Sequence, residues 1–139
     1  VVAAVVLAAL LLVWYPQPFG IEAEWNVGQG PELNPNGDRV ESRFLHGGYV
    51  QLEWKQDTSI GTWFPFTRWN YYKGARKFGN NAPHTSVNEI DAGFEYSPFP
   101  EVELTVAYTH SFERTNSRIA PYDLTKDADR LGVQVQWNY

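Results

Sequence analysis

The alternation of apolar and polar residues from Asp129 to Tyr139 is the feature that most restricts how this chain can fold. Successive side chains of a β-strand point to opposite faces, so the alternation predicts a strand. One face is polar and carries amides and Arg130, which suits a wet lumen, and the apolar face ends in aromatic residues, which suits a membrane–water interface. A half-buried strand of a soluble protein shows the same alternation, but these two features favour a membrane strand. The apolar face comprises Leu131, Val133, Val135, Trp137 and Tyr139.

The composition agrees with a β-protein in contact with a membrane interface. The 139 residues suffice for one domain, and the aromatic share of 16% includes six Trp and eight Tyr, which favour such interfaces. A net charge of −5 argues against a nucleic-acid partner, and the absence of cysteine excludes disulfides and cysteine-ligated metals. A run of ~18 apolar residues, which a spanning helix needs, does not occur, and a transmembrane barrel does not require one.

The same alternation recurs along the chain and predicts an all-β fold, an antiparallel transmembrane β-barrel. The strands are separated by connections that are short and long in turn, as in barrels with short periplasmic turns and long extracellular loops. A soluble β-sandwich shows no such regular rule. We expect residues 1–139 to form a single, partial barrel unit with strands near 1–14, 19–27, 48–55, 62–72, 87–96, 101–112 and 129–139.

The first segment, Val1 to Val13, differs from the rest because it contains only Val, Ala and Leu. As a helix it would reach about 20 Å, short of a ~30 Å hydrocarbon core, and as a strand its lumenal side would be entirely apolar. Our hypothesis is that its side-chain identities are provisional or engineered, and we assign it no function. The predicted total of about seven strands also departs from the even numbers of bacterial barrels and leaves unpaired edges, so we expect a piece of a longer barrel.

The charged residues of the inward-facing positions are the candidates for contact with solutes. Arg68 and Arg130 lie on predicted strands, and a guanidinium stays charged and forks onto phosphate oxygens. Each basic residue could equally be a solvated loop charge or a cross-strand partner of a carboxylate. Because carboxylates outnumber bases on this face, either acidic and basic walls oppose each other or the pore is less selective. The basic candidates at inward-facing positions are Arg68, Arg130 and Lys55, and those at or near predicted extracellular loops, where they could steer anions toward the mouth of the pore, are Lys73, Arg76 and Lys77. The acidic candidates, all at inward-facing positions, are Glu22, Glu24, Glu53, Glu89, Asp91, Glu95 and Glu103.

Motifs of catalysis or metal binding do not emerge. The histidines at 46, 84 and 110 are far apart in sequence, and His110 is predicted to face lipid or a subunit contact. Nucleophile-elbow, zinc-protease and phosphate-loop motifs are absent. Asp123, Asp127 and Asp129 could offer oxygen ligands to a divalent cation, but their spacing matches no EF-hand loop. We therefore predict a protein that is not an enzyme and has no cofactor.

Five segments together resemble the phosphate-selective porin O and P family. They are Phe19 to Asn26, Gly47 to Gln51, Gly79 to Pro83, Phe112 to Thr115 and Asp129 to Tyr139, and the similarity covers roughly Pro16 to Tyr139. The resemblance implies the C-terminal part of a 16-stranded antiparallel barrel, usually trimeric, that conducts small anions across the bacterial outer membrane. The family's phosphate site uses inward-folded loops and a ladder of lumenal Arg and Lys, which does not map residue by residue onto this chain. Val1 to Val13 departs from the family's alternating strands.

The predicted function is that of an outer-membrane porin for passive diffusion of small hydrophilic solutes, chiefly anions such as phosphate. The expected partners are outer-membrane lipid, other copies of the chain in a homotrimer, and the barrel assembly machinery, since Trp137 and Tyr139 resemble the C-terminal signal of outer-membrane barrels. Two other classes stay open, an outer-membrane barrel enzyme or adhesin and a soluble β-barrel or sandwich that binds a ligand. An enzyme would need a convergent His, Ser and carboxylate cluster, and a soluble barrel would turn its apolar face inward.

Overall fold

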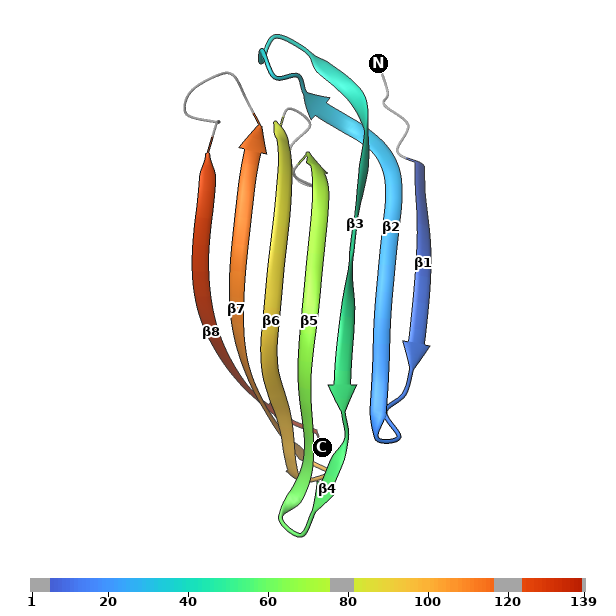
Figure 1. The fold of residues 1–139 in the computed structure, drawn as a ribbon, viewed down its shortest axis with the longest axis vertical. Coiled ribbons are helices and arrows are strands. Elements are labelled where there is room, and N and C mark those ends of the chain that lie inside the picture. The colour runs from blue at the N-terminus through green and yellow to red at the C-terminus, as the bar shows by residue number, and fades with distance from the viewer. Residues whose placement is uncertain (1–5, 76–81, 117–123, 139) are drawn as a thin grey trace.

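The computed structural model describes residues 6–75, 82–116 and 124–138, and this part of the chain folds as one eight-stranded antiparallel sheet (Figure 1). No helix in the described residues is long and apolar enough to cross a membrane. The predicted all-β antiparallel fold is confirmed. The strands are β1 (Val6–Trp14), β2 (Phe19–Leu33), β3 (Val40–Trp54), β4 (Gln56–Thr58), β5 (Gly61–Ala75), β6 (His84–Phe99), β7 (Val102–Asn116) and β8 (Thr125–Trp137).

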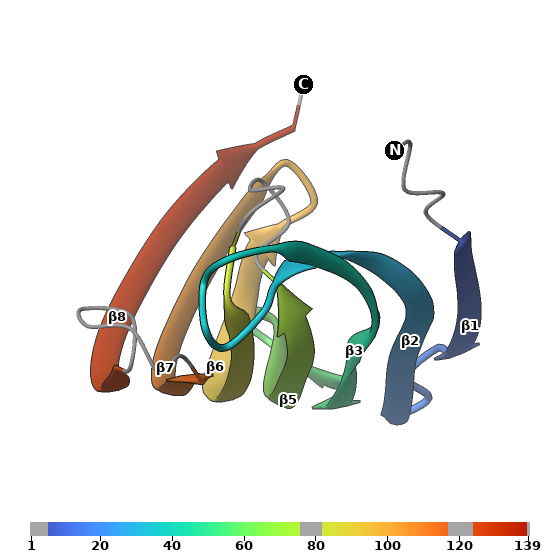
Figure 2. The same ribbon diagram turned by 90° about the horizontal axis from the view of Figure 1, so that it is seen from above.

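Strands that follow each other in sequence lie side by side in the sheet. The order is β1-β2-β3-β5-β6-β7-β8, and the short β4 pairs with β5. The sheet is open, and Figure 2 shows it curving, with β1 and β8 at its two rims and the β2–β3 connection arching over its hollow side. The end of the sheet that carries the β2–β3, β5–β6 and β7–β8 connections is called the loop end here, and the opposite end is the turn end.

Strands β2 and β3 are longer than the alternation predicted. The expected strands ended near residue 27 and began again near residue 48, yet the β2–β3 ladder continues to the pair Leu33 and Val40. A tight turn then reverses the chain, in which the Gly37 amide donates to the Asn34 carbonyl at 2.9 Å and Gly37 adopts a φ of 73°. The Asn34 side chain also accepts from the Asp38 amide at 3.1 Å. The turn falls on the Asn-Pro-Asn-Gly-Asp sequence because these residues tolerate turn conformations and bond to nearby backbone.

The registers of the ladders divide the side chains into two faces. Gln51, Arg68 and Asp91 lie opposite one another on β3, β5 and β6, and this face is called the hollow face. The outer face carries large apolar side chains that are open to the surroundings, as expected for strands that contact lipid. On it the Trp25 and Tyr71 rings stack 6.0 Å apart. Other exposed members are Leu52, Trp54, Trp69, Ile90, Tyr108, Leu131, Val133, Val135 and Trp137.

Strand β1 is an edge strand of the sheet and carries apolar residues on both faces. Leu11 and Val13 pair with Glu24 and Glu22, so they lie on the hollow face, where an apolar surface was expected for this segment. Whether these side chains are the natural ones stays a prediction, and residues 1–5 lie outside the described part of the chain.

Buried side chains gather at the loop end of the sheet. Thr85 on β6 and Thr115 on β7 are only 2% and 6% exposed, and Ala75 at the end of β5 is 6% exposed. The β2–β3 hairpin supplies two more buried residues, Glu32 and Asn34. The Leu33 amide of this hairpin donates to the Ala82 carbonyl, so the hairpin packs against the loop end of the sheet.

Candidate functional site on the hollow face

Arg68 is held near the middle of the hollow face by neutral partners. Its Nε donates to the Gln51 side-chain carbonyl at 2.8 Å, and its Nη2 donates to the same oxygen. The guanidinium carbon lies 5.2 Å from the centre of the Tyr49 ring, a cation–π distance. Gln51 is 6% exposed and therefore well fixed. Within the described residues no carboxylate forms an ion pair with Arg68 at 4.0 Å or less, so its charge is not cancelled by a direct partner.

Three carboxylates of the same face accept hydrogen bonds from amide side chains. Amide nitrogens are neutral donors, so these bonds bring no positive charge to the carboxylates. Glu95 has three other carboxylates of this face, Glu103, Glu53 and Glu22, as electrostatic neighbours, together with Arg68. The amide-to-carboxylate bonds run from Asn26 to Glu24 at 2.7 Å, from Gln51 to Glu53 at 3.2 Å and from Asn70 to Asp91 at 2.8 Å.

All predicted acidic residues lie on the hollow face in the structure. In each pair of neighbouring strands, the residues that lie opposite one another point to the same face. These cross-strand pairs connect the acidic residues to Gln51 and Arg68. The residues are Glu22, Glu24, Glu53, Glu89, Asp91, Glu95 and Glu103.

The predicted basic residues are distributed less evenly. Arg130 pairs in register with Thr109 on the hollow face, and its Nη2 donates to the Thr109 hydroxyl at 3.5 Å. Lys55 lies at the turn end, 3.6 Å from Asp57. Lys73 pairs with His46 and Ser86 and so lies on the outer face, because it follows the hollow-face residue Tyr72 by one position. Arg76 and Lys77 lie outside the described residues.

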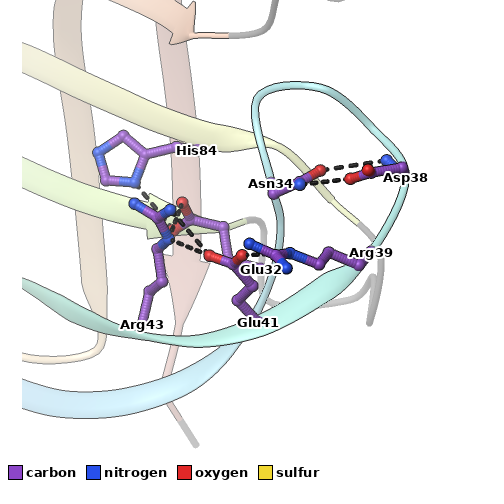
Figure 3. A network of polar contacts seen from close by, with 7 residues as sticks. All are labelled: Glu32, Asn34, Asp38, Arg39, Glu41, Arg43 and His84. Atoms are coloured by element: carbon purple, nitrogen blue, oxygen red, sulfur yellow. Dashed lines mark hydrogen bonds and ion pairs between the residues drawn. The ribbon is translucent and has the colours of Figure 1, made fainter.

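A second group of charges lies at the end of the β2–β3 hairpin and at the start of β6, and it was not among the predicted site residues (Figure 3). Glu32 is 3% exposed, and its Oε2 lies 2.9 Å from Nδ1 of His84 on β6. Its other oxygen lies 3.9 Å from Nε of Arg43. Arg43 and Arg39 both donate to Glu41, at 2.9 and 2.6 Å. Continuing the period of two from Glu24 through Gly28 and Gly30 would have placed Glu32 on the hollow face.

The outer face of β7 and β8 carries a polar cluster near the loop end. The Asp129 carboxylate accepts from the Tyr108 hydroxyl at 2.5 Å and lies 2.9 Å from His110 Nδ1, while Asp127 lies 3.5 Å from His110 Nε2. The polar groups of this cluster therefore contact one another. Among the described residues no group of three or more His, Asp or Glu could hold a metal ion, and Asp123 lies outside them.

Comparison with known proteins identifies the family of a chain with this sheet and this charged face. The model of the family described as phosphate-selective porin O and P matches residues 3–139. The chain belongs to this family. No curated protein and no solved structure matches it. The resemblance carried by the five sequence segments is confirmed, and the match extends it to nearly all of the N-terminal Val, Ala and Leu run.

Membership in this porin family gives the two faces their meaning. The family is one of channels of the bacterial outer membrane, so the outer face, with its exposed apolar side chains, is the candidate membrane-facing surface. The hollow face is then the candidate wall of the pore. This face combines the Arg68 guanidinium, whose partners are neutral, with carboxylates that accept hydrogen bonds from amides. Sequence reasoning missed Gln51 and Tyr49, because their role depends on the register between β3 and β5.

Proposed function

We propose that this chain forms part of an outer-membrane porin through which small hydrophilic solutes, chiefly anions such as phosphate, diffuse passively. The observation that carries the proposal is the setting of Arg68. Its guanidinium has five N–H donors, and its bonds to Gln51 leave others available. A phosphate that passes along the hollow face can therefore exchange part of its water shell for a fixed, permanently charged fork.

The acidic residues of the wall set the limits of this selectivity. They repel anions, and they outnumber Arg68 and Arg130 on the hollow face. Ring and wall charges decide ion preference in a pore. We propose a transverse field in which anions follow the arginines and carboxylates line the remaining surface, so that phosphate is preferred without cations being excluded.

The outer face supports the proposed partners. Its exposed apolar and aromatic side chains suit outer-membrane lipid and contact with further copies in a homotrimer. Trp137, 66% exposed at the end of β8, is available to the barrel assembly machinery, and Tyr139 lies outside the described residues.

Single-channel recording of the full-length protein in planar bilayers tests the proposal, with the reversal potential measured under a salt gradient and phosphate added as a blocker. We expect discrete open steps, an anion-favouring reversal potential and block by phosphate. Arg68→Gln is expected to weaken the block by roughly 3- to 10-fold, since a solvent-exposed charge-assisted contact contributes about 1 kcal/mol.

Lys73→Gln is the matched control, because it removes the same charge from the outer face. It should leave the block within about 2-fold of the parent, as expected for a charge that does not touch the pore solution. Open steps with a cation-favouring reversal potential would keep the porin and remove the anion preference. A protein without open steps would contradict the porin itself.

A further inference from the structure

The β2–β3 hairpin leaves the wall of the sheet before it reaches its turn. Strand β3 pairs with β5 only as far as His46, whereas β2 and β3 stay paired with each other up to Leu33 and Val40. Residues 30–43, called the hairpin tip below, therefore have no wall strand beside them on the β5 side. Figure 2 shows this tip arching over the hollow side of the sheet.

The tip lands on the beginning of β6 and not on its neighbour β5. The Leu33 amide donates to the Ala82 carbonyl at 2.9 Å, and Leu33 forms a parallel bridge with Pro83. In the sheet order β5 lies between β3 and β6. The tip therefore reaches across the end of β5, a region where Ala75, Thr85 and Thr115 are buried.

Glu32 fixes the tip in this position. It is 3% exposed, and a carboxylate removed from water is stable only when it is hydrogen-bonded or paired. Its partners come from both sides of the contact, His84 from β6 and Arg43 from the tip itself. Arg43 is held in turn by Glu41, which also binds Arg39 (Figure 3). This chain of charges ties the tip to the wall.

We propose that the hairpin tip is a constriction of the pore and that Glu32 and His84 are the positioning residues that hold it across the lumen. The proposal rests on the proposed porin function and adds which segment of this chain narrows the passage. The tip acts by occupying space, because its guanidiniums are already bound to Glu41. The size of the solutes admitted depends on the tip, whereas Arg68 on the wall contacts the anions.

The test measures pore size by exclusion of polyethylene glycols of graded mass during single-channel recording of the full-length protein. Glu32→Ala removes the carboxylate that joins His84 on β6 to Arg43 on the tip, and it should release the tip. We expect the mean conductance to rise roughly 1.5- to 3-fold and larger polymers to enter, as a constriction controls access. Glu101→Ala removes a carboxylate at the turn end and is the matched control, expected to keep the parent's exclusion size.

A tether separates release of the tip from general damage to the barrel. The chain has no cysteine, and the bridged positions Leu33 and Pro83 are within reach of a disulfide. Leu33→Cys with Pro83→Cys in the Glu32→Ala protein should restore the parent's conductance under oxidising conditions and lose it again on reduction. A tether that forms without lowering the conductance overturns the proposal.

A shortened hairpin gives a second, independent variant if Glu32→Ala does not assemble. Pro31 and Ser42 face each other in the β2–β3 register, so an Asn-Gly turn between them can replace residues 32–41 and leave the wall pairing unchanged. This variant should admit larger polymers than the parent. If the parent forms channels and the shortened variant keeps its exclusion size, the tip is not a constriction and the porin function stands. If the parent forms no channels, the porin function fails and this inference fails with it.

Discussion

On the wall of the hollow face, Arg68 contacts an amide and an aromatic ring, whereas on the hairpin tip Arg39 and Arg43 both contact the carboxylate of Glu41. The difference follows from the neighbours within reach, because Glu41 lies two positions along the chain from both Arg39 and Arg43, whereas Arg68 pairs in register with Gln51. The tip also contains the buried Glu32, whose charge must be paired to be stable. Three wall carboxylates accept hydrogen bonds from amide donors. Charges of the tip therefore support structure, and charges of the wall remain available to solutes.

The largest expected effect comes from the point where the two regions meet. Gly48 lies on β3 two positions after His46, where pairing with β5 begins, and a Cβ there would fall inside van der Waals contact with the Glu24 backbone carbonyl. Because backbone cannot move aside as a flexible side chain can, Gly48→Val should cost more than about 3 kcal/mol and prevent assembly of the barrel. Heat-modifiable mobility on gels measures the folded fraction.

Gly132→Ala is the control for this substitution, since the nearest atom to its added Cβ is the Ala107 carbonyl oxygen at 3.8 Å. We expect this variant to assemble like the parent. Normal assembly of Gly48→Val would show that β2 and β3 can separate at this point. It would contradict the idea that the wall and the tip are joined rigidly there.

The wall was predictable from the sequence and the tip was not. Period-two alternation placed Arg68 and Glu95 on one face, because each strand has a polar side and an apolar side. The Asn-Pro-Asn-Gly-Asp turn can also be predicted from the sequence, since its residue types carry the conformation themselves. The inward fold depends on Leu33 meeting Ala82, a contact between distant segments that no local pattern encodes. The abundance of Gly, Pro and Asn in this stretch instead favoured a loop.

Side-chain partners on the wall show a similar limit. The alternation predicted that Arg68 faces inward, but its contact with Gln51 depends on the β3–β5 register, which the intervening β4 and its turn determine. Lys73 shows the opposite case. Its position beside a loop suggested the pore, whereas parity along β5 places it on the outer face.

A direct comparison of Arg43 with Arg68 should give an intermediate effect. Arg43→Gln and Arg68→Gln remove the same charge from the protein, but Arg43 already donates to Glu41 through Nε and Nη2. We expect Arg43→Gln to change phosphate block by less than about 2-fold, against the roughly 3- to 10-fold expected for Arg68→Gln. Titration of single-channel current with phosphate measures both. Equal losses of block would mean that tip and wall both bind the anion.

The smallest expected effect is on the titration of Glu41, which lies on the tip beyond the wall-paired, membrane-spanning part of β3. The hydrogen bond from Arg43 is the main cause that lowers the pKa of the Glu41 carboxyl from its ordinary value. A carboxyl whose pKa is lowered on folding stabilises the folded tip at pH values above its ordinary pKa. That stabilisation disappears as the pH falls through the lowered pKa. The side-chain carbon signal of Glu41, followed by NMR of the detergent-solubilised protein, should therefore titrate at a higher pH in Arg43→Gln than in the parent. An unchanged midpoint would mean that Arg43 does not hold Glu41, and the chain of charges from His84 to Arg39 would then be broken at that step.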